Sequence, residues 1–126
     1  MLLLILFYSI DTFSQSIEKK DDNTIYSKTG IDVVPKFPEG LEKLNSYVNE
    51  NFQQAGFEKQ VKGKFYSIFV IEKDGSLSDI KILGKVNSRI AEELIRILKI
   101  MPKWNSGINN GITVRVLNTF TIVIEN

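Results

Sequence analysis

The sequence contains no cysteine and no histidine. Without thiols the chain has no disulfide and no cysteine nucleophile, and without imidazole it lacks the commonest general base. The usual ligands of zinc, copper, haem and iron–sulfur clusters are absent as well. Carboxylates remain for hard cations, but their spacing does not match a calcium-binding loop. We therefore expect no catalytic residue, no cofactor and no metal site.

The chain also lacks a charge imbalance, because its formal net charge is +1 over 126 residues. A near-neutral chain has no basic field for nucleic acid or anionic lipid, and no glycine-rich phosphate loop is present. Nucleic acid and small-molecule substrates are therefore not expected partners. Hydrophobic residues make up 43% and charged residues 25%, which is typical of one soluble globular domain.

The first residues differ in composition from the rest. Leu2 to Tyr8 is an unbroken apolar run, shorter than the ~20 residues of a membrane-spanning helix but suited to a signal peptide. Small residues follow, so we predict a signal peptide over 1–15 and export to the periplasm, although no Lys or Arg follows Met1. The alternative is a buried N-terminal strand. The polar, aperiodic stretch 16–32 predicts a flexible linker, and 33–126 the folded domain.

Two segments have apolar residues at helical spacing. The first runs from Leu41 to Phe52 and ends before Gly56. The second runs from Ile90 to Met101, with Asn87 or Ser88 as its N-cap and Pro102 beyond its end. Before them, two prolines interrupt the backbone, and Phe37 between them is expected to anchor this stretch to the core.

Three further segments predict strands. Lys64–Glu72 and Leu77–Leu83 flank the turn sequence Lys-Asp-Gly-Ser, and Ile112–Glu125 is a long final strand. The predicted order is α-β-β-α-β. This order indicates an α+β fold, in which two helices pack on a three-stranded antiparallel sheet.

Several short motifs stand in a fixed order along 33–124. They are Pro-Lys-Phe-Pro-Glu-Gly at 35–40, Gly63, the strand–Asp-Gly–strand hairpin at 69–80, Met-Pro-Lys-Trp at 101–104, and Asn-Gly at 110–111. Together they resemble the TonB C-terminal domain in the form found in Bacteroidetes. Glu39, the pair Phe52-Gln53 and Thr121 depart from the residues common in that family.

The resemblance implies a periplasmic domain, not an enzyme, that binds an extended segment of outer-membrane TonB-dependent receptors. In such a domain the peptide adds a strand to a free sheet edge. By resemblance that edge is the last strand, with the binding residues Val114, Arg115, Val116, Leu117, Asn118, Thr119, Phe120, Thr121 and Ile122.

A second interaction surface is suggested by the apolar residues on both faces of Lys64–Glu72. With two helices covering one face, the other face is expected to carry an exposed apolar patch of Tyr66, Ile68, Val70, Leu117 and Val123. Such a patch usually marks a partner surface or a homodimer. The alternative is that the N-terminal residues fold over it.

The resemblance does not by itself imply energy transduction. An energy transducer is anchored at the inner membrane and must reach the outer one. The roughly twenty residues between the predicted signal peptide and Pro35 span at most ~70 Å when fully extended. The sequence also lacks the long Pro-rich spacer that is typical of the family. If Met1 is the true start, we therefore expect a free TonB-like binding module; a start further upstream that adds a membrane span and a spacer would make it membrane-associated and restore the transducing role. The alternative hypothesis is a self-associating or scaffolding periplasmic domain with no transducing role.

Overall fold

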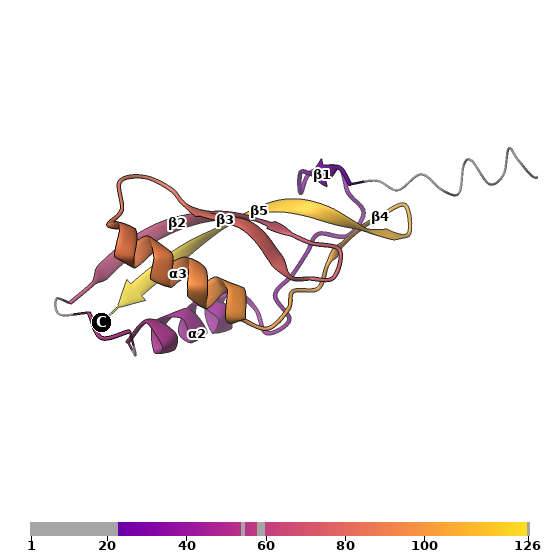
Figure 1. Cartoon of the computed structure of the whole chain (residues 1–126). Coiled ribbons are helices and arrows are strands. Elements are labelled where there is room, and N and C mark those ends of the chain that lie inside the picture. Colours follow the sequence, from indigo (N-terminus) through magenta and orange to yellow (C-terminus); the bar gives the residue numbers. More distant parts are fainter. Residues whose placement is uncertain (1–22, 54, 58–59, 126) are drawn as a thin grey trace, which may run out of the picture.

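The computed structural model describes residues 23–53, 55–57 and 60–125. It is an α+β fold of two helices and a mixed sheet of five strands (Figure 1). The elements in chain order are β1 (Ile25–Tyr26), α2 (Leu41–Gln53), β2 (Lys62–Ile71), β3 (Leu77–Ile82), α3 (Ser88–Ile100), β4 (Gly107–Asn109) and β5 (Ile112–Glu125).

The sheet differs from the expected three-stranded antiparallel one. The strand order is β1-β5-β2-β3, and β4 also pairs with β5. The expected antiparallel pairs β2–β3 and β2–β5 are present, but β1 lies parallel to β5, which makes the sheet mixed. The expectation was wrong because β1 has two residues and β4 has three. Strands this short carry no readable alternation.

The short strand β1 falls inside the stretch expected to be a linker, 16–32. Ile25 pairs with Arg115 and Tyr26 with Val116, and the carboxylate of Asp32 accepts the backbone N–H of Asn110 at 2.9 Å. Residues 23–32 therefore belong to the fold and are not a free linker. Residues 16–22 and the predicted signal peptide, 1–15, lie outside the described residues.

Both helices cover the same face of the sheet (Figure 1). Each buries the side chains at helical spacing that the sequence predicted: Leu44, Val48 and Phe52 from α2, and Leu94, Ile97 and Leu98 from α3. The Asn87 side chain caps α3 as expected, accepting the N–H of Arg89 at 2.9 Å. Leu41 was expected on the apolar face of the first helix, but its side chain is 55% exposed.

A close backbone approach joins the β2–β3 turn to Trp104. The backbone N–H of Trp104 donates to the carbonyl of Gly75 at 2.9 Å. A Cβ at position 75 would lie 2.0 Å from the Trp104 carbonyl oxygen, and the φ angle of +87° also favours glycine. The indole, which is 5% exposed, packs edge-to-face on Phe37 and Phe69. Phe37 is thus the core anchor that the sequence predicted, and Trp104 is held beside β5.

Candidate peptide-binding edge

The strand β5 has one side that is hydrogen-bonded to β2 and another that faces away from it. The carbonyl of Tyr66 accepts a hydrogen bond from the N–H of Leu83, so the backbone groups of Tyr66 face β3. Tyr66 and its partner Thr121 on β5 are therefore a pair without mutual hydrogen bonds. The backbone groups of Thr121 therefore face outward. Because the register of β2 and β5 is regular from Lys62 to Ile71, every second residue of β5 behaves in the same way. Arg115, Leu117, Thr119, Thr121, Val123 and Glu125 form this outward edge.

At its C-terminal end the outward edge is closed by α2. The side-chain amide of Asn45 donates to the carbonyl of Val123 at 3.0 Å and accepts its N–H at 2.9 Å. Asn49 donates to the same carbonyl at 2.7 Å and accepts the N–H of Glu125 at 3.1 Å. The two amides thus take the place of a neighbouring strand. An incoming strand cannot pair there without displacing them.

At the other end the edge is closed by β1, which pairs with Arg115 and Val116. These residues, and Val114, which pairs with Gly107 of β4, belong to the binding edge expected from the sequence. The open part is therefore shorter than the expected range from Val114 to Ile122. It comprises 118–122, where Thr119 and Thr121 are exposed and point outward, whereas Asn118, Phe120 and Ile122 are buried on the helix face.

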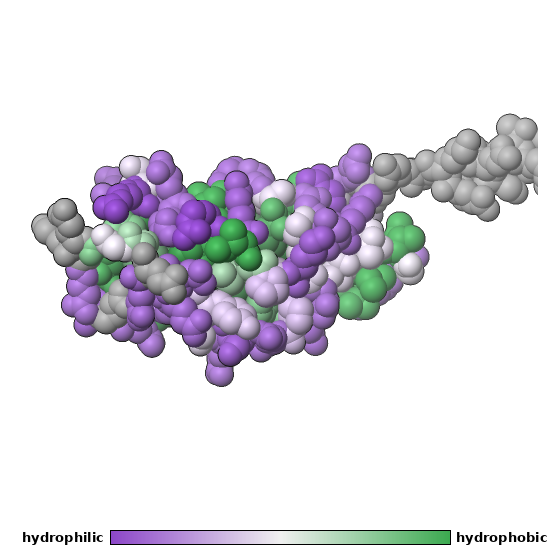
Figure 2. Space-filling view, turned by 60° about the horizontal axis from the view of Figure 1, so that its bottom comes forward, coloured by the Kyte–Doolittle hydropathy of each residue, from purple (hydrophilic) through white to green (hydrophobic). Residues whose placement is uncertain are grey.

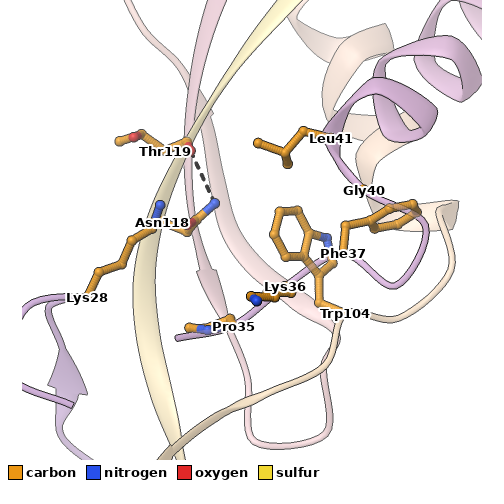
Figure 3. Close-up of a pocket in the computed structure, with 9 residues that line it drawn as sticks. All are labelled: Lys28, Pro35, Lys36, Phe37, Gly40, Leu41, Trp104, Asn118 and Thr119. Carbon is orange, nitrogen blue, oxygen red and sulfur yellow. Dashed lines mark hydrogen bonds between the residues drawn. The ribbon is translucent and has the colours of Figure 1, made fainter. Parts of the chain in front are cut away.

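Within the described part of the chain, no strand pairs with the outward side of Thr119 or Thr121. The Thr119 carbonyl accepts one hydrogen bond, from the Asn118 side chain at 3.1 Å (Figure 3). Unpaired N–H and C=O groups in an extended row are the groups that a further strand satisfies. In the stretch 118–122, which we call the open edge, the outward N–H of Thr119 and both outward backbone groups of Thr121 therefore have no strand partner among the described residues.

A pocket lies against the open edge on its helix face, with a volume of about 250 Å³. Its walls come from the segment before α2, the Trp104 loop and β5, and Lys28 extends toward it from the residues after β1 (Figure 3). We call it the Trp104 pocket; it is lined by Lys28, Pro35, Lys36, Phe37, Gly40, Leu41, Trp104, Asn118 and Thr119. The indole N–H has no acceptor among the described residues, and Figure 3 shows it on the Phe37 side of the ring.

A second, more open hollow of about 550 Å³ continues along the same edge. We call it the Thr121 hollow; it is lined by Leu41, Glu42, Asn45, Thr119, Phe120, Thr121, Val123 and Glu125. Leu41 and Thr119 border both recesses. The exposure of Leu41, which contradicted the expectation for the first helix, therefore places an apolar side chain between two recesses beside the open edge.

The closed end near β1 is tied by an ion pair. Arg115 bonds both carboxylate oxygens of Glu72, at 2.8 and 3.1 Å, and its third nitrogen donates to the carbonyl of Asn23 at 3.0 Å. Hydrogen bonds from Arg115, and then from Ser78, lower the pKa of Glu72 below its ordinary value. Arg115 therefore does not line the open edge but holds the chain just before β1 against β5.

The predicted apolar patch on the outer face is only partly exposed. Tyr66 is 54% and Leu117 is 44% exposed, whereas Ile68 and Val123 are half-buried. Val70 is 1% exposed, so it does not belong to the patch. Figure 2 shows apolar surface also at the end of the molecule that carries β4, where Ile112 is 56% and Val33 is 47% exposed.

Residues 23–53, 55–57 and 60–125 contain no group of three or more acidic side chains that would hold a metal ion. No helix of the described chain is long and apolar enough to cross a membrane.

No family model matches the sequence, and no curated protein matches it either.

Sequence reasoning missed the residues that bound the open edge. In the sequence, Asn45 and Asn49 fall outside the apolar face of the first helix. Their spacing of four residues on one helix face was the available signal, but a polar residue at that spacing usually faces solvent. The bond between an α2 amide and a strand 74 to 78 residues later depends on how the helix packs on the sheet.

Proposed function

We propose that the protein is a peptide-binding module of the TonB C-terminal type, acting in the periplasm. It would bind an extended segment of an outer-membrane TonB-dependent receptor by adding it as a strand to the open edge of β5. The role is binding and not catalysis. The proposal combines the resemblance along 33–124 with one structural observation, which is the short open edge between two closed ends.

The observation that carries the proposal is the contrast between the outward residues of β5. The backbone of Val123 and Glu125 is bonded by two asparagines, and Arg115 and Val116 are paired with β1. Thr119 and Thr121 lie between these ends beside a recess of about 250 Å³. Strand addition draws affinity from main-chain hydrogen bonds and specificity from pockets for alternate side chains. The open edge offers both.

The test is a titration of the full chain with extended receptor-type peptides, followed by amide NMR signals. We expect the amides of Thr119 and Thr121 to shift and to gain protection from hydrogen exchange, while those of Val123 and Glu125 stay as they are. The absence of a shift at Thr119 and Thr121 at millimolar peptide would sink the proposal.

A matched pair of proline variants isolates the backbone donor. Thr121→Pro removes an outward N–H inside the open edge, and we expect about tenfold weaker binding from the loss of one hydrogen bond. Thr113→Pro is the control. Ile108 of β4, the partner of Thr113, forms its backbone hydrogen bonds with Val33 and not with β5. The N–H of Thr113 therefore also faces away from the strand that pairs with it, but Thr113 lies outside the open edge. Equal weakening by both variants would contradict strand addition at 118–122.

The second candidate function is self-association. The exposure of Tyr66 and Leu117 on the outer face favours it, because large exposed apolar side chains on one face of a sheet often mark a contact surface. Sedimentation over a hundredfold range of concentration distinguishes the two. A dimer that Tyr66→Ser and Leu117→Ser abolish, with no peptide response at Thr119 or Thr121, would favour self-association.

A further inference from the structure

The two recesses beside the open edge share Leu41 of α2, and α2 covers one face of the sheet, so both recesses adjoin that face of a strand added there. Successive side chains of an added strand point to opposite faces, so side chains two residues apart share a face and are separated by about 6.5 Å. The Trp104 pocket and the Thr121 hollow both border Leu41 and Thr119. Neighbouring recesses along one edge therefore receive side chains i and i+2 of the peptide and not i and i+1.

The two recesses also differ in charge. Lys28 and Lys36 line the Trp104 pocket, and Glu42 and Glu125 line the Thr121 hollow. All four residues are exposed. Among the residues that the structure describes, none of the four has an oppositely charged group within salt-bridge distance. The charged groups therefore remain available to a ligand.

The apolar part of the recesses comes from residues that are already fixed. Trp104 and Phe37 are 5% and 4% exposed and pack on each other at 5.7 Å between ring centroids. Leu41 is the exposed apolar member, at 55%. A side chain entering beside Leu41 covers this leucine without moving the core. The recesses therefore favour compact apolar side chains over long polar ones.

From this arrangement we propose that the open edge selects a dipolar peptide. The ligand is an extended segment with apolar side chains at i and i+2. Two positions beyond the apolar residue in the Trp104 pocket it carries an acidic residue, and two positions beyond the one in the Thr121 hollow it carries a basic residue, so that all four side chains share one face. This inference rests on the proposed function, because it presumes strand addition at the open edge. It adds the side-chain chemistry of the partner and sets the direction in which that partner lies.

The length of the partner segment follows from the closed ends. Pairing stops at β1 on one side and at the amides of Asn45 and Asn49 on the other. The open edge of 118–122 therefore pairs with about five residues at ~3.3 Å each. A longer peptide gains no main-chain hydrogen bonds beyond that, unless one of the closed ends opens.

The experiment uses two independent signals from the full chain. Trp104 is the single tryptophan, so its fluorescence reports on the Trp104 pocket, while the amide signals of Thr119 and Thr121 report on strand addition. The probes are capped nine-residue peptides of threonine and serine with valine at i and i+2. One carries glutamate two positions beyond one valine and lysine two positions beyond the other, one has glutamine at both of these positions, and one has its valines at i and i+1.

We expect the charged peptide to bind about threefold to tenfold more tightly than the glutamine peptide at low salt. The difference should largely vanish at 0.5 M salt because exposed charges are screened. The peptide with adjacent valines should bind more weakly and change the Trp104 emission less, because one of its valines faces the other side of the strand.

Charge-reversal variants assign the effect to the named residues. Lys28→Glu combined with Lys36→Glu should remove the advantage of the charged peptide, and Glu42→Lys combined with Glu125→Lys should do the same. The control is Lys85→Glu combined with Lys99→Glu, which reverses two exposed lysines that line neither recess and should leave the advantage in place.

The outcomes separate the two proposals. If all three peptides shift Thr119 and Thr121 with equal affinity, strand addition stands and the dipolar selection is wrong. If none of them shifts these amides, the proposed function itself fails. If the amides of Thr119 and Thr121 are already protected in the free monomer, a segment of the chain itself occupies the edge, and the inference of an external dipolar ligand is overturned.

Discussion

The two sides of β5 are built from the same strand and behave differently. On the side of β2, ten consecutive residue pairs form a regular antiparallel ladder from Lys62 to Ile71. On the outward side, each stretch has a different neighbour: β1 over Arg115 and Val116, no strand over 118–122, and two asparagine side chains over Val123 and Glu125. The inward side holds the sheet together, and the outward side leaves one stretch of backbone without a neighbouring strand among the described residues.

The largest expected effect comes from a proline on the side of β5 that pairs with β2. Ile122 faces β2 and is fully buried, so Ile122→Pro removes a ladder hydrogen bond in addition to the side chain. We expect Ile122→Pro to lower the free energy of unfolding by about 3 kcal/mol more than Ile122→Ala does. Urea unfolding of both variants measures the difference. Equal losses would mean that the N–H of residue 122 is not part of the ladder.

The closed C-terminal end is tested by removing the amides that cover it. Asn45→Ala combined with Asn49→Ala deletes the side-chain hydrogen bonds to Val123 and Glu125. We expect the free energy of unfolding to fall by about 2–3 kcal/mol, with faster hydrogen exchange at Val123 and Glu125. Asn51→Ala is the control on the same helix. Among the described residues, the Asn51 side chain bonds the carbonyl of Tyr47 within α2 and no residue of β5, so its loss should lower the free energy of unfolding by less than about 1 kcal/mol.

The closed end near β1 is tested by pH. Arg115 lowers the pKa of Glu72 in the folded protein, so on acidification the unfolded state takes up this proton first. The stabilisation is present above the ordinary glutamate pKa of about 4.3 and is lost as the pH falls through the lowered value. We expect Glu72→Gln to lower the free energy of unfolding by about 1 kcal/mol at pH 7, and by progressively less as the pH falls through the lowered pKa of Glu72.

The measurement for this end is the free energy of unfolding from pH 3 to pH 7, with Glu92→Gln as the control. Glu92 is an exposed residue of α3, and its replacement should leave the pH profile of the wild type nearly unchanged. A Glu72→Gln profile that runs parallel to the wild-type profile would show that the Arg115 ion pair does not stabilise the fold.

The smallest effect is expected at the open edge itself. Thr121→Pro removes an N–H that no strand accepts within the described residues, and proline is tolerated on the free edge of a sheet. We expect the free energy of unfolding to change by less than about 1 kcal/mol, although peptide binding weakens. A loss as large as that of Ile122→Pro would break the comparison between the two sides of β5.

Much of the fold was readable from local pattern. The helices were expected over Leu41–Phe52 and Ile90–Met101, and α2 and α3 begin and end within two residues of these bounds. The long final strand has the expected bounds, Ile112–Glu125. These segments are predictable because a period of 3.6 or 2 repeats several times within each of them. The two- and three-residue strands β1 and β4 have no such repeat, so the number of strands was wrong.

For the candidate site, the sequence predicted the strand but not which part of it is open. The resemblance pointed to the last strand, and the open edge lies within the predicted range Val114–Ile122. The extent of the edge was not predictable, because it depends on Asn45, Asn49 and β1, which come from other parts of the chain. The same holds for Val70, whose alternation predicted exposure but whose side chain is 1% exposed.

The sequence by itself determined the chemical limits of the protein and its main elements. The absence of cysteine and histidine excludes several kinds of site in any fold, and repeated apolar spacing sets the helices and long strands through local backbone geometry. Only the tertiary structure decided which stretch of β5 stays unpaired and which charges stand beside it. These properties arise from residues far apart in the sequence: Asn45 bonds Val123, and Lys28 and Thr119 line one pocket. No local pattern encodes them.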